Sequence, residues 1–171
     1  MFGAVKNLLS NLTGDAGPRS QANDHNLRLA TAALLTRVAT VDRDMSEARR
    51  EALHTVLQSK FTLDDHATGR LLEEAFVINR RAIDLYHFTR ELNEMLDDDG
   101  RSQLVQMMWE VVYADGHANE FDKNIIWRAA DLLGVSSRRR VELRQMVSAN
   151  RVALSKARDV LPQSLALDPA R

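Results

Sequence analysis

Hydrophobic positions recur with helical spacing along most of the chain. In the stretch 24–41, Leu27, Leu34 and Val38 lie on one face of a predicted helix that begins at Asp24. The same kind of pattern predicts further helices over 48–61, 62–78, 82–96, 103–114, 120–133 and 137–160. No stretch shows the sustained alternation of apolar and polar residues that indicates a half-buried strand. The pattern therefore predicts an all-α fold with about seven helices.

The N-terminal segment has an apolar face of its own. Its apolar positions are Phe2, Val5, Leu8, Leu9 and Leu12. Residues 2–12 are therefore expected to form a short helix that docks on a partner or mediates homo-oligomerisation. Peripheral contact with a membrane is an alternative, although Lys6 alone would support it electrostatically. Residues 13–23 collect turn-forming and polar residues, which indicates a flexible linker.

The other end of the chain is also expected to lie outside the bundle. Pro162 ends the last predicted helix, and the tail over 161–171 is expected to fray. The predicted organisation is a helix and linker over 1–23, a helical domain over 24–160, and this tail.

An internal repeat organises the predicted domain. The stretch VVYADGHANEFDKNIIWRAADLLGV (111–135) has a weaker copy in VATVDRDMSEARREALHTVLQSKFTL (38–63). The copies superpose with Asp42 on Asp115, Glu47 on Glu120 and Leu53 on Ile126. Two copies of a three-helix unit joined by a middle helix would form one compact pseudo-symmetric bundle. A solenoid would need three or more repeats.

Composition narrows the class of protein. The 171 residues are 44% hydrophobic and 27% charged with a net charge of −1, as in an ordinary globular domain. The absence of cysteine removes disulfides, thiolate metal sites and cysteine nucleophiles, and it fits a reducing cytoplasm. No apolar run approaches the ~18 residues needed to span a bilayer. A cytoplasmic location is therefore expected, including the inner face of the membrane.

The first acidic turn is a candidate metal site. Asp42 and Asp44 lie in the turn, and Glu47 and Glu51 follow at a spacing of four on one helical face. Four neighbouring carboxylates favour a hard divalent cation, with calcium ahead of magnesium. The alternative is purely structural, because Asp44 and Glu47 have the spacing of a helix-capping box. The turn is not an EF-hand, since the twelfth position is Leu53.

The second turn is chemically different. Asp115 and Glu120 are retained, but His117 replaces one carboxylate, which would favour zinc or manganese over calcium. Here too a capping box, between Asn119 and Asp122, is the structural alternative. A hydrolase that uses His117 as general base is a weaker interpretation, because no nucleophile context, phosphate loop or HExxH spacing accompanies it.

Charged residues are unevenly distributed along the predicted helices. The acidic set is Asp84, Glu91, Glu94, Asp97, Asp98 and Asp99. The basic set, on the last helix, is Arg138, Arg139, Arg140, Arg144, Arg151, Lys156 and Arg158. This division suggests electrostatic recognition of a protein partner. Nucleic acid is disfavoured, because no aromatic residues are interleaved with the basic ones.

Several large apolar residues are expected to form the core. On the predicted helices 103–114 and 120–133 these are Met107, Met108, Trp109 and Trp127. On the middle helix the expected buried face consists of Ile83, Tyr86, Leu92 and Leu96.

With both turns in view, the chain resembles the tellurite-resistance TerB-like family over roughly residues 25–148. The resemblance lies in YADGHANEFDKNIIWRAADLLGVSS, in VATVDRDMSEARREALHTVL, and in the intervening IDLYHFTRELNEMLDDDGRSQLVQMMWEVVYADG. It implies a compact helical domain without enzymatic activity and a role around stress response or membrane-associated complexes. It also implies divalent-metal sites, which fall here on Asp42, Asp44, Glu47, Glu51, Asp115 and Glu120. Arg43 stands where the first turn would have its glycine.

Two functions follow as expectations. The first is a non-enzymatic module whose acidic turns bind a divalent cation and whose charged faces bind a protein. The oxygen ligands favour calcium as this cation. The second is a purely structural adaptor, in which the turns are only helix caps and residues 2–12 dock on a partner or membrane.

Overall fold

The computed structural model describes residues 18–41, 45–81 and 84–160. These residues form seven α-helices and one short 3-10 helix, with no strand among them. The helices are α2 (Pro18–Ala39), α3 (Glu47–Phe61), α4 (Asp65–Arg81), α5 (Tyr86–Met95), α6 (Asp98–Val112), η1 (Tyr113–Asp115), α7 (Glu120–Leu132) and α8 (Ser137–Val160). The all-α prediction is confirmed, while the pseudo-symmetry of the two repeats stays a prediction.

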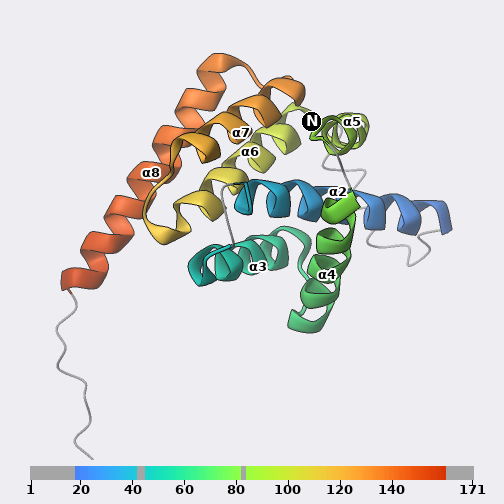
Figure 1. The fold of residues 1–171 in the computed structure, drawn as a ribbon, viewed down its shortest axis with the longest axis horizontal. Helices are drawn as coiled ribbons and strands as arrows, with labels where there is room; N and C mark the ends of the chain where they lie inside the picture. Colours follow the sequence, from blue (N-terminus) through green and yellow to red (C-terminus); the bar gives the residue numbers. More distant parts are fainter. Residues whose placement is uncertain (1–17, 42–44, 82–83, 161–171) are drawn as a thin grey trace, which may run out of the picture.

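Helix α2 is the central element of the bundle. It contacts α3, α4, α5, α6 and α7, and Figure 1 shows it crossing the middle of the molecule. Every side chain from Ala30 to Thr36 is buried, so this part of α2 has no solvent face. A helix surrounded in this way needs small or apolar residues on all sides, and the sequence ATAALLT provides them.

Helix α6 supplies the other large part of the core. Met107, Met108 and Trp109 are buried there, as predicted. Trp127 does not follow the prediction, because it is only half-buried on α7. Its ring packs instead under the guanidinium of Arg140, whose central carbon lies 5.6 Å from the ring centroid.

Several helix starts differ from the sequence expectation, and α6 begins at Asp98 rather than at residue 103. Helix α2 begins at Pro18, inside the predicted linker, and proline is favoured at the first position of a helix. Helix α5 begins at Tyr86, whose side chain is 59% exposed rather than buried. Leu92 is buried as predicted, together with Phe88 four residues before it, and Leu96 is half-buried. Among the described residues, only Tyr86 departs from the predicted buried face. Ile83 lies outside the described residues.

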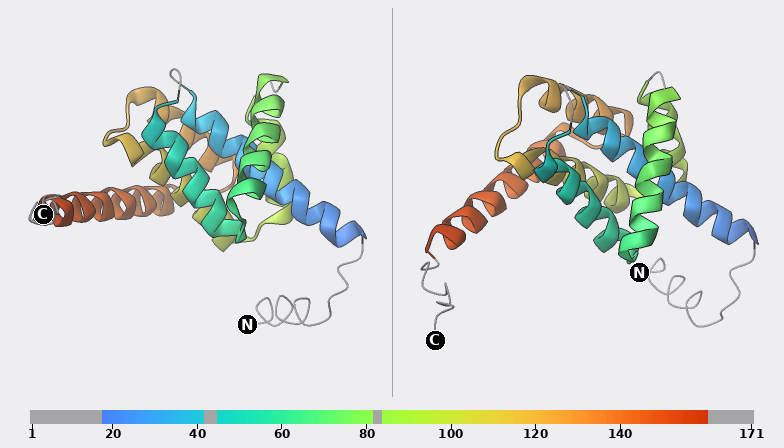
Figure 2. Two further views of the ribbon diagram at one scale, coloured as in Figure 1. Left: turned by 90° about the horizontal axis from the view of Figure 1, so that it is seen from below. Right: turned by 60° about the horizontal axis from the view of Figure 1, so that its bottom comes forward.

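Helix α8 leaves the bundle part of the way along its length. Leu143 and Val147 are buried, but every described side chain from residue 149 to residue 158 is exposed. Figures 1 and 2 show this half of α8 extending away from the other helices. We call residues 149–158 the α8 arm.

The predictions for the two ends of the chain remain untested. The expected helix over 2–12 and the expected tail over 161–171 both lie outside the described residues. Within the described ranges, no helix combines the length and the apolar character needed to cross a bilayer.

Candidate functional site

A buried arginine joins the starts of two helices. Arg49 is the third residue of α3, and Asp122 is the third residue of α7. Arg49 Nη1 and Nη2 donate to the two carboxylate oxygens of Asp122 at 2.8 and 2.7 Å. Its Nε donates to Oδ2 of Asp115, the last residue of η1, at 2.8 Å. The guanidinium therefore bridges Asp115 and Asp122, and we call this group the Arg49 bridge.

Capping residues fix the two helix starts that meet at the bridge. The Asn119 side chain accepts a hydrogen bond from the Asp122 N–H at 2.9 Å, and Asp122 accepts one from the Asn119 N–H at 3.0 Å. The capping box predicted for the second turn is thus confirmed. In the first turn, the cap of α3 is Ser46, because the helix begins at Glu47. The box predicted between Asp44 and Glu47 is therefore wrong.

The Arg49 bridge is shielded from water. The side chain of Arg49 is 8% exposed and that of Asp122 is 0% exposed. Burial by itself lowers the pKa of Arg49. The hydrogen bonds and the charge of Asp122, followed by those of Asp115, raise the pKa by more than burial lowers it, so the pKa of Arg49 lies above its ordinary value. The arginine thus stays charged, and its single positive charge lies against two carboxylates. The Ser46 hydroxyl adds a hydrogen bond to Asp115 Oδ2 at 3.3 Å.

The structure does not gather the metal-ligand candidates of the second turn. Asp115 is engaged by Arg49, and His117 is exposed with its Nδ1 4.0 Å from Asp115 Oδ1. Glu120 points to Lys123, with 2.5 Å between the carboxylate and the ammonium. No group of three His, Asp or Glu side chains in the described part of the chain could hold a metal ion. Of the three candidates, only Asp115 contacts the guanidinium of Arg49.

The candidates of the first turn are only partly described. Asp42 and Asp44 lie outside the described residues. Glu47 and Glu51 are both exposed on α3, and Glu47 lies 3.7 Å from Arg50. Metal binding at this turn therefore stays a prediction.

Sequence reasoning missed Arg49 and Ser46 altogether. The repeat contained a usable signal, because superposing Glu47 on Glu120 also places Arg49 on Asp122. Residues of opposite charge at equivalent positions of two packed copies are natural partners for an ion pair. Applying the alignment to every charged position would have predicted the bridge.

A second candidate site lies between α7 and α8. It is a depression of about 370 Å³ lined by Tyr113, Trp127, Val141, Arg144, Gln145 and Ser148, and we call it the α7–α8 surface. Arg144 Nε donates to the Tyr113 hydroxyl at 3.3 Å, and its guanidinium carbon lies 5.4 Å from the Trp109 ring centroid. Aromatic rings and arginines thus hold one another in place on an accessible surface.

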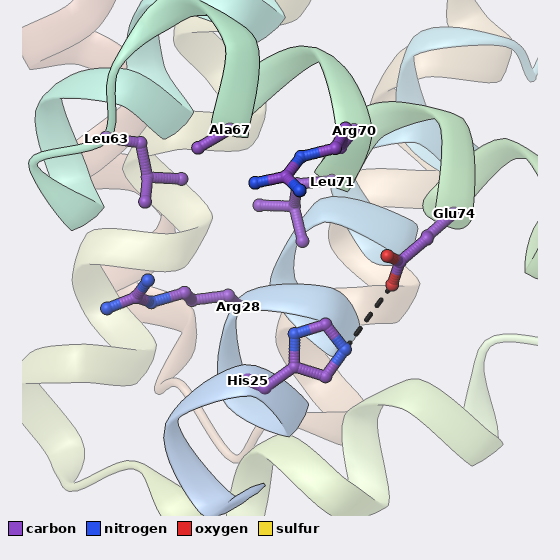
Figure 3. Close-up of a pocket in the computed structure, with 7 residues that line it drawn as sticks. All are labelled: His25, Arg28, Leu63, Ala67, Arg70, Leu71 and Glu74. Carbon is purple, nitrogen blue, oxygen red and sulfur yellow. Dashed lines mark ion pairs between the residues drawn. The ribbon is translucent and has the colours of Figure 1, made fainter. Parts of the chain in front are cut away.

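A third depression lies where α2 meets α4, and Figure 3 shows its lining residues. Its volume is about 290 Å³. His25 Nε2 lies 3.3 Å from Glu74, as drawn in Figure 3, and Arg28 pairs with Asp24 at 2.5 Å. His25 and Arg28 thus already have acidic partners, whereas Arg70, which also lines the depression, forms no ion pair with a described residue.

Comparison with known families agrees with this architecture. The family model described as tellurite resistance protein TerB matches residues 28–145, which include both helix starts of the Arg49 bridge and most of the α7–α8 surface. Comparisons with curated proteins and with solved structures found no match. The family model covers more than half of the chain, and the chain therefore belongs to the tellurite resistance TerB family.

Proposed function

We propose that this TerB-family protein is a non-enzymatic binding module that recognises an acidic segment of a protein partner through the α7–α8 surface and the α8 arm. The observation that carries the proposal is the departure of α8 from the bundle, which leaves residues 149–158 exposed. We further propose that the partner belongs to a stress-response or membrane-associated complex.

The composition of the α7–α8 surface supports protein recognition. Tryptophan, tyrosine and arginine are the residue types that most often dominate binding at protein interfaces. Trp127, Tyr113 and Arg144 occur together here, and Val141 beside them is 42% exposed. Arg144 is already held by its contacts with Tyr113 and Trp109, so little side-chain freedom would be lost on binding.

The α8 arm supports an acidic partner. It carries Arg151, Lys156 and Arg158, together with the exposed apolar residues Val152 and Leu154. An isolated helix of this length gains little stability from its own hydrogen bonds and depends on packing. A partner with acidic and apolar residues would satisfy both the charges and the apolar groups of the arm.

Tryptophan fluorescence can test the proposal. The chain has two tryptophans, so a Trp109→Phe variant reports on Trp127 alone. The full chain would first be used to capture a partner protein from host extract, and the captured protein would be identified. A synthetic peptide of its acidic segment would then be titrated into the Trp109→Phe variant. We expect a blue shift of Trp127 emission, and about 100-fold weaker binding by Arg144→Glu, because charge reversal replaces attraction with repulsion.

The matched control is Arg90→Glu, an exposed arginine on α5 that lies outside the α7–α8 surface. It should bind the same peptide with unchanged affinity. The proposal would be contradicted if Arg144→Glu captured the partner and bound the peptide as well as the unmodified protein and Arg90→Glu do.

We also propose calcium binding at the first acidic turn. The support is the run of oxygen ligands in Asp42, Asp44, Glu47 and Glu51. Calorimetry of metal-stripped protein should give a calcium signal that Asp42→Asn removes and Glu73→Gln, an exposed carboxylate on α4, preserves. Absence of any heat at millimolar calcium would remove the metal from the account.

A further inference from the structure

A pocket between α2, α5 and α7 has an apolar wall and two arginines. Its volume is about 300 Å³. The apolar wall consists of Val41, Leu85, Phe121 and Ile125, and the arginines are Arg37 on α2 and Arg128 on α7. None of these residues belongs to the α7–α8 surface, so the pocket is a separate feature of the molecule.

Helix α7 builds one side of this pocket. Phe121, Ile125 and Arg128 are spaced by four and then three residues, so they share one face of the helix. Phe121 is 61% exposed, a large apolar area that the core of the bundle does not use. Asp122 and Trp127 lie on other faces of the same helix, where they serve the Arg49 bridge and the α7–α8 surface.

The two arginines of the pocket differ from most others in the fold. Arg49, Arg101 and Arg140 each contact a carboxylate, whereas neither Arg37 nor Arg128 forms an ion pair or hydrogen bond with any residue that the structure describes. Among the described residues that line the pocket, one is acidic, Asp84, and it accepts a hydrogen bond from the Tyr86 N–H at 3.0 Å. Two guanidinium groups against one carboxylate leave the pocket positively charged.

We propose that this pocket binds an apolar group that bears a carboxylate. The apolar part would cover Phe121 and Ile125, and the carboxylate would accept hydrogen bonds from Arg37 and Arg128. Guanidinium groups suit this role because they pair with carboxylates through two parallel hydrogen bonds. The Asn124 side chain, which also lines the pocket, can add a further polar contact.

The size of the pocket limits the ligand. A volume of about 300 Å³ is at the lower end of ligand pockets, so it suits one short aliphatic chain or one aromatic ring. The same chemistry occurs in a fatty acid and in a peptide that ends in an apolar residue with a free carboxylate.

Titration of the full chain by NMR tests the proposal, with backbone amides as probes. N-acetyl-phenylalanine represents the peptide terminus and octanoate the fatty acid, while N-acetyl-phenylalanine amide lacks the charge. We expect the carboxylates to shift the amides of Phe121, Asn124 and Arg128. We expect the neutral amide to bind at least about tenfold more weakly, because it loses the charge-assisted hydrogen bonds.

Substitutions localise the effect. Arg37→Gln and Arg128→Gln should each weaken carboxylate binding about tenfold, while Arg138→Gln, an exposed arginine on α8, should leave it unchanged. Arg128 is exposed, so its variant tests the proposal even if Arg37→Gln fails to fold. Whichever of N-acetyl-phenylalanine and octanoate binds more tightly identifies the source of the ligand as a peptide terminus or a fatty acid.

Two outcomes would overturn the proposal. One is equal binding of the acid and the amide, and the other is carboxylate binding that neither arginine variant weakens. Since no residue of the α7–α8 surface is changed, either failure would leave the proposed protein recognition untouched.

Discussion

The starts of α3 and α7 occupy equivalent positions in the two copies of the repeat, but they differ in charge. Each helix begins with a glutamate, at Glu47 and Glu120, and each follows a side-chain cap. Two residues further on, α3 has Arg49 where α7 has Asp122. Arg49 and Asp122 form a buried ion pair. The opposite charges at this position of the two copies therefore join the start of α3 to the start of α7.

This comparison changes the expected chemistry of the second turn. Asp115, His117 and Glu120 suggested a metal ion, yet Asp115 is paired with Arg49 of α3 and Glu120 is paired with Lys123. Asp115 and Asp122, which form the Arg49 bridge, therefore serve the fold. The calcium site that we propose therefore lies in the first turn.

The largest effect is expected when the bridge is cut at Arg49. Arg49→Ala leaves Asp122 buried without a counter-charge, which should lower the free energy of unfolding by about 3–5 kcal/mol. Chemical denaturation followed by circular dichroism would measure it. The neighbouring Arg50→Ala removes an exposed arginine and should change stability by less than about 0.5 kcal/mol. Equal effects of the two substitutions would show that the bridge contributes nothing.

The backbone of the second turn is the next point of difference. Gly116 has a φ of 100°, whereas Arg43 stands in the corresponding turn of the first copy. Gly116→Ala should cost about 1–2 kcal/mol, because a Cβ disfavours this conformation even where no atom obstructs it. Gly69→Ala, within helix α4 and also unobstructed, should instead stabilise by about 0.5–1 kcal/mol. Thermal melts would measure both effects. Melting temperatures of the two variants that change in the same direction would contradict this explanation.

The caps of the two helices should be similar in strength. Ser46→Ala and Asn119→Ala each remove an oxygen that accepts a backbone N–H, and each should cost about 1 kcal/mol. Denaturant midpoints would measure both. A cost confined to Asn119→Ala would mean that Ser46 does not cap α3.

The smallest effect concerns the exposed first turn of α7. The hydrogen bond from Lys123, together with its charge, holds the pKa of Glu120 below its ordinary value. Since the folded pKa is the lower one, the contribution of this pair is present at neutral pH and is lost as pH falls through that pKa. Lys123→Ala should raise the pKa of Glu120 in an NMR titration. Glu142, whose pKa is lowered by Arg138 and Arg139, should not change.

Local patterns predicted the elements well but not the contacts between them. The capping box of Asn119 and Asp122 follows from spacing alone, and the predicted end of the helix at residue 133 agrees with the observed end of α7 at Leu132. Arg49 could not be distinguished from Arg50 by local pattern, since only the packing of α3 against η1 buries one and exposes the other. Trp127 has core spacing on its helix, but α8 covers it only in part.

A double-mutant cycle between Arg49 and Asp122 tests the central claim most directly. Arg49→Met and Asp122→Asn each remove one charge, and the asparagine keeps an oxygen for the Asn119 N–H. The Arg49 bridge predicts that the double variant is more stable than the sum of the single losses by at least about 2 kcal/mol, because neither charge is left buried alone. The claim would be contradicted if the loss of unfolding free energy in the double variant equalled the sum of the two single losses to within about 0.5 kcal/mol.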